Sequence, residues 1–215
     1  MIAFRARRSW RTASYAVLDF ETTGLDLEHD HVLSYGVVPV EDGRIRLSGA
    51  RYAVVRPPIA VPSDSIRVHG VRPVELEDAP ELEDVAAELL GALADRHMVA
   101  YAAEIELAFL GRLHEGRGLP RPRRVIDVID LAVEVATREG GEASPSLRLS
   151  DLAERYGVPF ARTHHAFADA LITAQLFLVL ATRLEGLGVG GVRGLLRAGR
   201  SRRARAVLAG TLGSR

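Results

Sequence analysis

The stretch YAVLDFETTG, from Tyr15 to Gly24, decides how this chain is interpreted. Residues 15–20 predict a short buried strand, which the following threonines and glycine bring to an end. Asp19 and Glu21 lie two positions apart, so a strand points both carboxylates to one face. Burying two such groups unpaired is costly, and a divalent cation, which prefers oxygen ligands, would relieve their repulsion. The alternative for this pair alone is a solvated strand end.

Outward from this strand, the pattern is that of an α/β domain. The hairpin signal Glu41-Asp42-Gly43 joins two strand-like runs, and the later strands alternate with amphipathic helices, which predicts a mixed sheet with helices on its faces. The further strands are expected at 31–40, 44–56, 97–101 and 124–128, and the helices at 81–94, 104–115, 129–138, 149–156 and 166–184.

Composition excludes several classes of protein. The chain has 215 residues, 47% of them hydrophobic and 26% charged, which excludes a disordered or collagen-like chain. It has no cysteine, which excludes thiol chemistry and cysteine-ligated metal centres and fits a cytoplasmic location. Its longest apolar run, 171–181, is shorter than the ~20 residues that span a bilayer, so we expect no membrane segment.

Charge is distributed unevenly along the chain. Its 28 basic residues are all arginine, and all 28 acidic residues lie between residues 12 and 185. We therefore expect a basic N-terminal segment (1–11), an acidic domain (12–185) and a Gly/Arg-rich C-terminal tail (186–215). The tail is expected either to contact phosphate or to be a solvated terminus.

A second motif runs from His164 to Asp169. Asp169 falls within the first two turns of the expected helix, near the positive end of its dipole. Helical positions five apart point about 140° away from each other, so both side chains reach one site only if His164 precedes the helix. His165, four residues before Asp169, is the competing partner.

Together the two motifs resemble the DEDDh branch of the 3′–5′ exonuclease superfamily. Asp19 to Gly24 matches its first motif, and His164 to Asp169 matches the His-x4-Asp of its third. The resemblance covers residues 14–183 and implies a ribonuclease H-like fold. That fold is a mixed five-stranded sheet, an antiparallel meander plus parallel strands, flanked by helices. Asp127 resembles an aspartate in a further motif of the family. For Asp127 we favour a structural role over that of a metal ligand.

The family's second motif, His-Asn-x-x-Phe-Asp, is altered in this chain. Glu106 occupies the position of the acidic residue, and Tyr101-Ala102 replaces the His-Asn pair. Ser34 stands where many members carry glutamate. We expect the extra methylene of Glu106 to weaken one metal site and to favour Mn²⁺ over Mg²⁺.

The resemblance implies a mechanism with two divalent ions, Mg²⁺ or Mn²⁺. Asp19 would bridge the ions, Glu21 and Asp169 would complete the first site, and Glu106 would help to hold the second. His164 would act as general base. The 3′ nucleotide would be contacted by residues of the first motif and the loop after it, and by one histidine: Thr22, Thr23, Gly24, Leu25 and His69. For His69, a turn-stabilising role is an equal alternative.

Three functions stay open from the sequence. The first is an exonuclease that releases nucleoside 5′-monophosphates from the 3′ end of single-stranded DNA or RNA, with DNA favoured. The second is a catalytically weakened nucleic-acid-binding or polymerase-accessory module of the same fold. The third is an enzyme acting on small nucleotides or short oligonucleotides. A DNA polymerase or a second copy of the chain is an expected protein partner.

Overall fold

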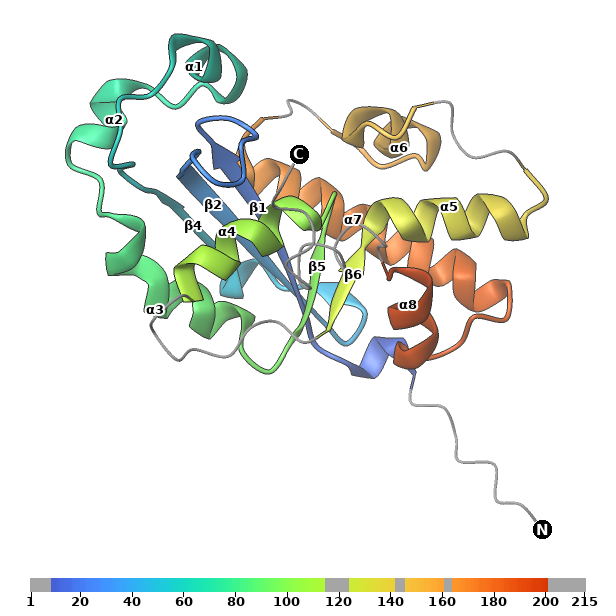
Figure 1. Ribbon diagram of the computed structural model, residues 1–215. Helices are drawn as coiled ribbons and strands as arrows, with labels where there is room; N and C mark the ends of the chain where they lie inside the picture. The colour runs from blue at the N-terminus through green and yellow to red at the C-terminus, as the bar shows by residue number, and fades with distance from the viewer. Residues whose placement is uncertain (1–8, 115–123, 142–145, 161–163, 201–215) are drawn as a thin grey trace.

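A mixed β-sheet runs through the middle of the domain, with helices on both faces (Figure 1). The computed structural model describes residues 9–114, 124–141, 146–160 and 164–200. The strands follow the order β3-β2-β1-β5-β6, with β4 also paired to β2; β1 to β4 pair antiparallel, and β1, β5 and β6 pair parallel. Their bounds are β1 (Tyr15–Thr22), β2 (Val32–Glu41), β3 (Arg44–Ile45), β4 (Arg51–Val54), β5 (His97–Ala100) and β6 (Val125–Asp127).

The sheet has six strands rather than the five expected. A 3₁₀ turn at Leu47–Gly49 interrupts the single strand predicted at 44–56 and divides it into β3 and β4. Both pieces pair with β2, β3 near its end and β4 along its middle. They therefore share one edge of the sheet, which stays five strands wide.

The helices predicted from apolar periodicity are present, with ends within a few residues of those expected. Three short helices, α1, α2 and α8, were not predicted, because five to seven residues carry too little periodicity to be recognised. The helices are α1 (Ser63–His69), α2 (Pro73–Glu77), α3 (Leu82–Leu93), α4 (Glu104–His114), α5 (Val128–Arg138), α6 (Leu149–Arg155), α7 (Ala166–Gly186) and α8 (Val192–Ala198).

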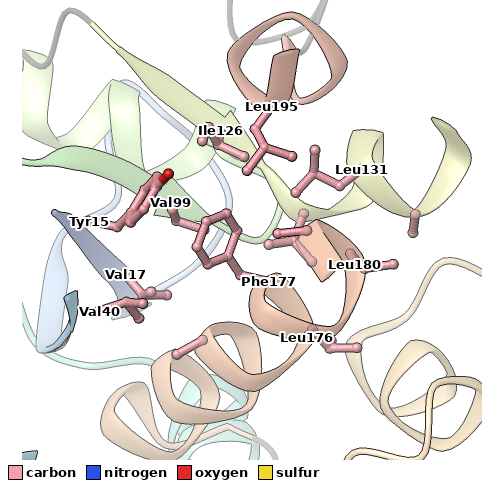
Figure 2. Close-up of a cluster of buried hydrophobic side chains, with 14 of the residues drawn as sticks. Tyr15, Val17, Val40, Val99, Ile126, Leu131, Leu176, Phe177, Leu180 and Leu195 are labelled. Carbon is pink, nitrogen blue, oxygen red and sulfur yellow. The ribbon is translucent and has the colours of Figure 1, made fainter. Parts of the chain in front are cut away.

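The larger core lies between the sheet and α7. Tyr15 and Val17 of β1 point to this face, where the Phe177 ring of α7 packs 4.7 Å from the Tyr15 ring (Figure 2). The alternate residues Leu18 and Phe20 face the opposite core, built with α3 and α4. Because side chains alternate along a strand, Asp19 and Glu21 continue the row of Tyr15 and Val17 toward α7.

The packed body extends beyond residues 12–185 at both ends. Trp10 is fully buried, with its ring edge-on to Phe177 at 6.0 Å. Leu195 of α8 is also fully buried in the α7 core, and Gly199 accepts a hydrogen bond from the Asp127 amide. The arginines at 5, 7 and 8, and those from 202 on, lie outside the described residues.

Helix α7 is long and apolar enough, by length and composition, to cross a membrane. This differs from the expectation of no membrane segment, because the helix extends beyond the apolar run at 171–181 at both ends. Most of the helix is covered: eleven of its 21 residues are buried, and it packs on β1, β2 and α5. We therefore regard it as the core helix of this domain.

Candidate active site

Three carboxylates meet where β1 ends and α7 begins. One oxygen each of Asp19, Glu21 and Asp169 lies within 4.8 Å of the other two. Glu21 and Asp169 are buried, whereas Asp19 keeps part of its surface exposed. The structure thus brings together the acidic residues of the first and third motifs, 148 or more positions apart in the chain.

Gly36 allows α7 to begin this close to the sheet. It pairs with Asp19 across β1 and β2, and a Cβ at this position would lie 2.4 Å from the Ala166 carbonyl oxygen and 2.6 Å from the Phe167 Cα. The first turn of α7 occupies the space that a side chain would fill, and this places Asp169 beside Asp19. Gly36 was not among the predicted site residues, although a glycine inside a strand indicates close backbone approach.

Glu106 supplies a fourth carboxylate from the first turn of α4. It is buried, and its Oε2 has no hydrogen-bond partner among the described residues. It is not one of the three groups that lie within 4.8 Å of one another. Burial has the largest effect on the pKa of Asp19 and raises it. The charge of Glu106 has the next largest effect, greater than those of Glu21 and Asp169, and also raises it. Glu106 therefore lies close enough to Asp19 for their charges to interact.

The electrostatics of this cluster favour binding of a cation. Burial raises the pKa of Glu21 to about 8, with the Asp169 charge adding to the effect. Burial also raises the pKa of Asp169 and that of Glu106. Asp169 Oδ1, like Glu106 Oε2, is buried without a hydrogen-bond partner in the part of the chain described. Oxygen ligands with unused lone pairs and mutual repulsion are the donor set that suits a hard divalent cation.

His164 lies just before α7, as the helix geometry predicts. Its side chain is exposed, and its backbone takes the left-handed conformation with φ +71°. Its amide donates a hydrogen bond of 2.7 Å to Asp169 Oδ2, which ties the residue to the cluster. His165 instead caps α7, with Nδ1 3.5 Å from the Ala168 amide, and its ring stacks on Tyr52.

The loop after β1 uses two predicted substrate residues to hold its own shape. Thr23 is buried, and its hydroxyl donates to Asp30 Oδ1 at 2.5 Å. A Cβ on Gly24 would lie 2.4 Å from Asp30 Oδ2, so glycine is needed here for close approach rather than for an unusual backbone angle. Leu25, by contrast, is 74% exposed. Contacts of these residues with a nucleotide stay a prediction.

His69 forms the turn-stabilising contacts that were the alternative to nucleotide binding. Its Nδ1 accepts a hydrogen bond from the Val71 amide at 2.9 Å, and its Nε2 lies 2.8 Å from Ser65 Oγ. The Ser65 hydroxyl donates a hydrogen bond to the carbonyl oxygen of Thr22. The Thr22 hydroxyl in turn donates one to the carbonyl oxygen of Gly24. The pKa of the buried imidazole is lowered by desolvation. Ser65 therefore connects α1 to the end of β1, and His69 holds the Ser65 hydroxyl.

Comparison with known proteins identifies the family. The family model described as "Exonuclease" (RNase_T) matches residues 16–177, which is most of the chain. The chain belongs to the DEDD-type 3′–5′ exonuclease family.

Two curated relatives carry this exonuclease domain within much longer chains. The chain is 29% identical over 177 residues to "3′-5′ exonuclease DinG" of Staphylococcus haemolyticus, covering 82% of this chain and 19% of the relative. It is 31% identical over 182 residues to "DNA polymerase III PolC-type" of Thermotoga petrophila, covering 84% of this chain and 13% of the relative. The chain thus spans about a fifth or less of these relatives.

A solved structure supports the fold of the exonuclease domain. "Exonuclease X in complex with 5′ overhanging duplex DNA" superposes with a TM-score of 0.65 at 20% identity, covering 86% of this chain and 99% of that one. The fold is accordingly the ribonuclease H-like sheet implied by the sequence motifs.

In this exonuclease domain, Asp127 positions the helix that carries Glu106. It is buried; its Oδ2 accepts a hydrogen bond from the Ala103 amide at 3.0 Å, and its Oδ1 accepts one from Ile129 at 2.8 Å. Burial raises its pKa to about 6. Ala102, next to Ala103, has φ +53°, a conformation that alanine rarely adopts. Asp127 therefore has the structural role favoured from the sequence.

Arg112 joins the loop after β1 to α4, and no sequence signal pointed to it. Its guanidinium donates to the carbonyl oxygens of Glu28, at 2.9 Å, and of Asp30, and lies over the Phe109 ring. The loop is thereby fixed to the same helix that presents Glu106.

Proposed function

We propose that this domain hydrolyses phosphodiester bonds at the 3′ end of single-stranded nucleic acid. DNA is the favoured substrate, and nucleoside 5′-monophosphates are the products. The observation that carries the proposal is the meeting of Asp19, Glu21 and Asp169 within 4.8 Å, with His164 hydrogen-bonded to Asp169 through its amide. The DinG relative, named as a 3′–5′ exonuclease, supports the same direction of attack.

The carboxylates would hold two divalent ions, Mg²⁺ or Mn²⁺. Asp19 would bridge the ions, with Glu21 and Asp169 at the first and Glu106 at the second. Divalent ions, when bound, neutralise the negative charge that develops on the phosphate oxygens and make water a stronger nucleophile. The oxygens of Glu106 and Asp169 that lack a hydrogen-bond partner among the described residues support this arrangement, because they would be available as ligands.

His164 would take the proton from the attacking water. Its side chain is exposed, and its backbone amide is held by Asp169 of the cluster. An imidazole accepts and releases protons near neutral pH, which suits it to general base catalysis. Leu25, exposed on the loop after β1, would pack against the terminal base, with Thr22, Thr23, Gly24 and His69 shaping the wall beside it.

End-labelled oligonucleotides test the proposed reaction. Single-stranded DNA and RNA labelled at the 5′ end are incubated with Mg²⁺, with Mn²⁺ and with chelator, beside the Asp19→Asn variant. We expect a ladder that shortens from the 3′ end, faster on DNA, and no products with chelator or with Asp19→Asn. Intact oligonucleotide with either metal, from a folded protein, would refute the proposal.

A weakened binding or polymerase-accessory module is the second candidate. Glu106 in place of aspartate favours it, together with relatives named as PolC-type polymerases. Under this candidate the protein binds single-stranded oligonucleotides without shortening them and co-purifies with a polymerase. Equilibrium binding measured beside the cleavage assay separates the two functions.

The remaining features of the proposal concern the cellular setting. We infer a cytoplasmic protein acting in DNA replication or repair, with a polymerase or a second copy of the chain as its partner. The Gly/Arg-rich tail (186–215) would contribute contacts to phosphate, whereas the acidic domain would carry the chemistry.

A further inference from the structure

A stacked aromatic pair flanks the carboxylate cluster, and the mechanism above does not use it. The Tyr52 ring of β4 and the His165 imidazole lie 4.7 Å apart between centroids and are inclined by 19°. Tyr52 is 41% exposed, and His165 is exposed as well. Exposed aromatic rings beside a site offer a flat face on which another ring can stack.

The strand register places this pair beside the acidic residues. Asp19 pairs with Gly36, and Gly36 pairs with Tyr52, so the three form one row across β1, β2 and β4. Directly paired residues point to the same face of a sheet, and two strand spacings separate Asp19 from Tyr52, about 10 Å. Tyr52 and Asp19 therefore stand on the same face, on either side of the gap at Gly36.

The first turn of α7 fills that gap. Its backbone at Ala166 and Phe167 lies directly over Gly36. On one side of this crossing, Asp169 reaches the cluster with Asp19 and Glu21; on the other, His165 reaches Tyr52. One helix start thus presents both a carboxylate and half of an aromatic pair to the same end of the sheet.

We propose that Tyr52 and His165 form a stacking platform for a nucleobase of the strand whose 3′ end lies at the carboxylate cluster. The inference rests on the proposed function and adds a residue pair that contributes to binding of the substrate strand. Every base has an aromatic face, so such a platform recognises single-stranded nucleic acid without sequence preference. The phenol ring has few rotatable bonds, so little conformational entropy is lost when a base stacks on it.

Substitutions at Tyr52 combined with abasic oligonucleotides test the platform. Tyr52→Val removes the ring and keeps a residue that suits a strand, and Tyr52→Phe is the matched control that retains the ring. Affinity is measured by fluorescence anisotropy with Ca²⁺ replacing Mg²⁺ or Mn²⁺. The probes are a single-stranded DNA and three derivatives, each with one abasic site among the last three nucleotides.

The expected result is a loss that depends on the base. Tyr52→Val should weaken binding of the intact oligonucleotide about tenfold, as expected for one lost stacking contact, and Tyr52→Phe should bind like the wild type. With the abasic site at the stacked position, wild type and Tyr52→Val should bind equally. His165→Asn, which retains a side chain able to cap α7, should show the same dependence.

Three results would overturn the platform. Equal affinity of Tyr52→Val and wild type for the intact oligonucleotide would show that the ring makes no contact. The same loss on all four oligonucleotides would show that the pair only fixes the start of α7. If the wild type binds DNA but never cleaves it, the exonuclease proposal fails while the platform is still tested; if it binds no oligonucleotide, both proposals fail.

Discussion

The substitution Gly36→Ala would test how strongly cleavage activity depends on the position of the first turn of α7 against the sheet. The added Cβ would lie 2.4 Å from the Ala166 oxygen and 2.6 Å from its carbonyl carbon, whereas ordinary contacts begin at 3.4 Å. The atoms in the way belong to backbone, so no side chain can rotate aside. The first turn of α7 must therefore move by about 1 Å, the difference between these contact distances.

This displacement should affect stability and activity by different amounts. Overpacking of this kind costs about 1–3 kcal/mol, which for a domain of this size lowers Tm by about 2–12 °C. Asp169 and the His164 amide move with the helix while Asp19 and Glu21 stay on β1. A misplacement of about 1 Å in a catalytic constellation can cost about 10²-fold in rate, so the loss of activity should exceed the loss of folded protein.

The assay compares Gly36→Ala with Gly91→Ala, both followed by thermal melting and by cleavage of a 5′-labelled oligonucleotide. Gly91 lies in α3, where an added Cβ meets nothing within 4 Å, and alanine there should raise stability by about 0.5–1 kcal/mol. If folded Gly36→Ala cleaves the oligonucleotide at the wild-type rate, this glycine does not set the spacing of the carboxylates. An unchanged Tm would refute the close packing itself.

Three further outcomes are expected. Because burial raises the pKa of Glu21 from its ordinary 4.5 to about 8, the folded state retains a proton that the unfolded chain loses, so stability in chelator should fall as pH rises between these values. Melting at pH 5 and pH 8 checks this; a Tm that rises with pH would contradict it, and Mn²⁺ should reduce the loss. Glu106→Asp should raise Mg²⁺-dependent cleavage relative to Mn²⁺-dependent cleavage in initial-rate assays, whereas no rise would show that Glu106 already reaches a suitable position. Ala102→Gly should raise the free energy of unfolding in urea by up to about 1 kcal/mol, because φ +53° strains alanine; a decrease would show that the strain is absent.

Much of the fold follows from local patterns in the sequence. The alternation in Tyr15–Thr22 places Asp19 and Glu21 on one face. If His164 and Asp169 serve one site, helix geometry requires His164 to precede α7, where the structure has it. Both inferences depend on residues close together in the chain. The interruption at Leu47–Gly49 was not predicted, because a short 3₁₀ turn leaves the surrounding strand-like composition unchanged.

Features of the site that depend on distant contacts were beyond the sequence. The roles of Gly36 and Tyr52 follow from strand register and from the approach of α7, which no local pattern encodes. Thr23 looked available to a ligand, but its hydroxyl is used by Asp30 seven residues later. Trp10 is fully buried against Phe177, 167 positions away, and no pattern near residue 10 predicts that contact.

The distribution of the carboxylates along the chain has a consequence for biosynthesis. Asp19 and Glu21 leave the ribosome early and Glu106 midway, but Asp169 arrives with α7, the helix that also covers one face of the sheet. Chains emerge from the N-terminus first. A nascent chain that ends near residue 160 therefore has three of the four carboxylates of the candidate site and lacks the helix that covers this face of the sheet. The last carboxylate of the candidate site is therefore supplied by the same helix that completes the core, so the cluster cannot assemble before the core does.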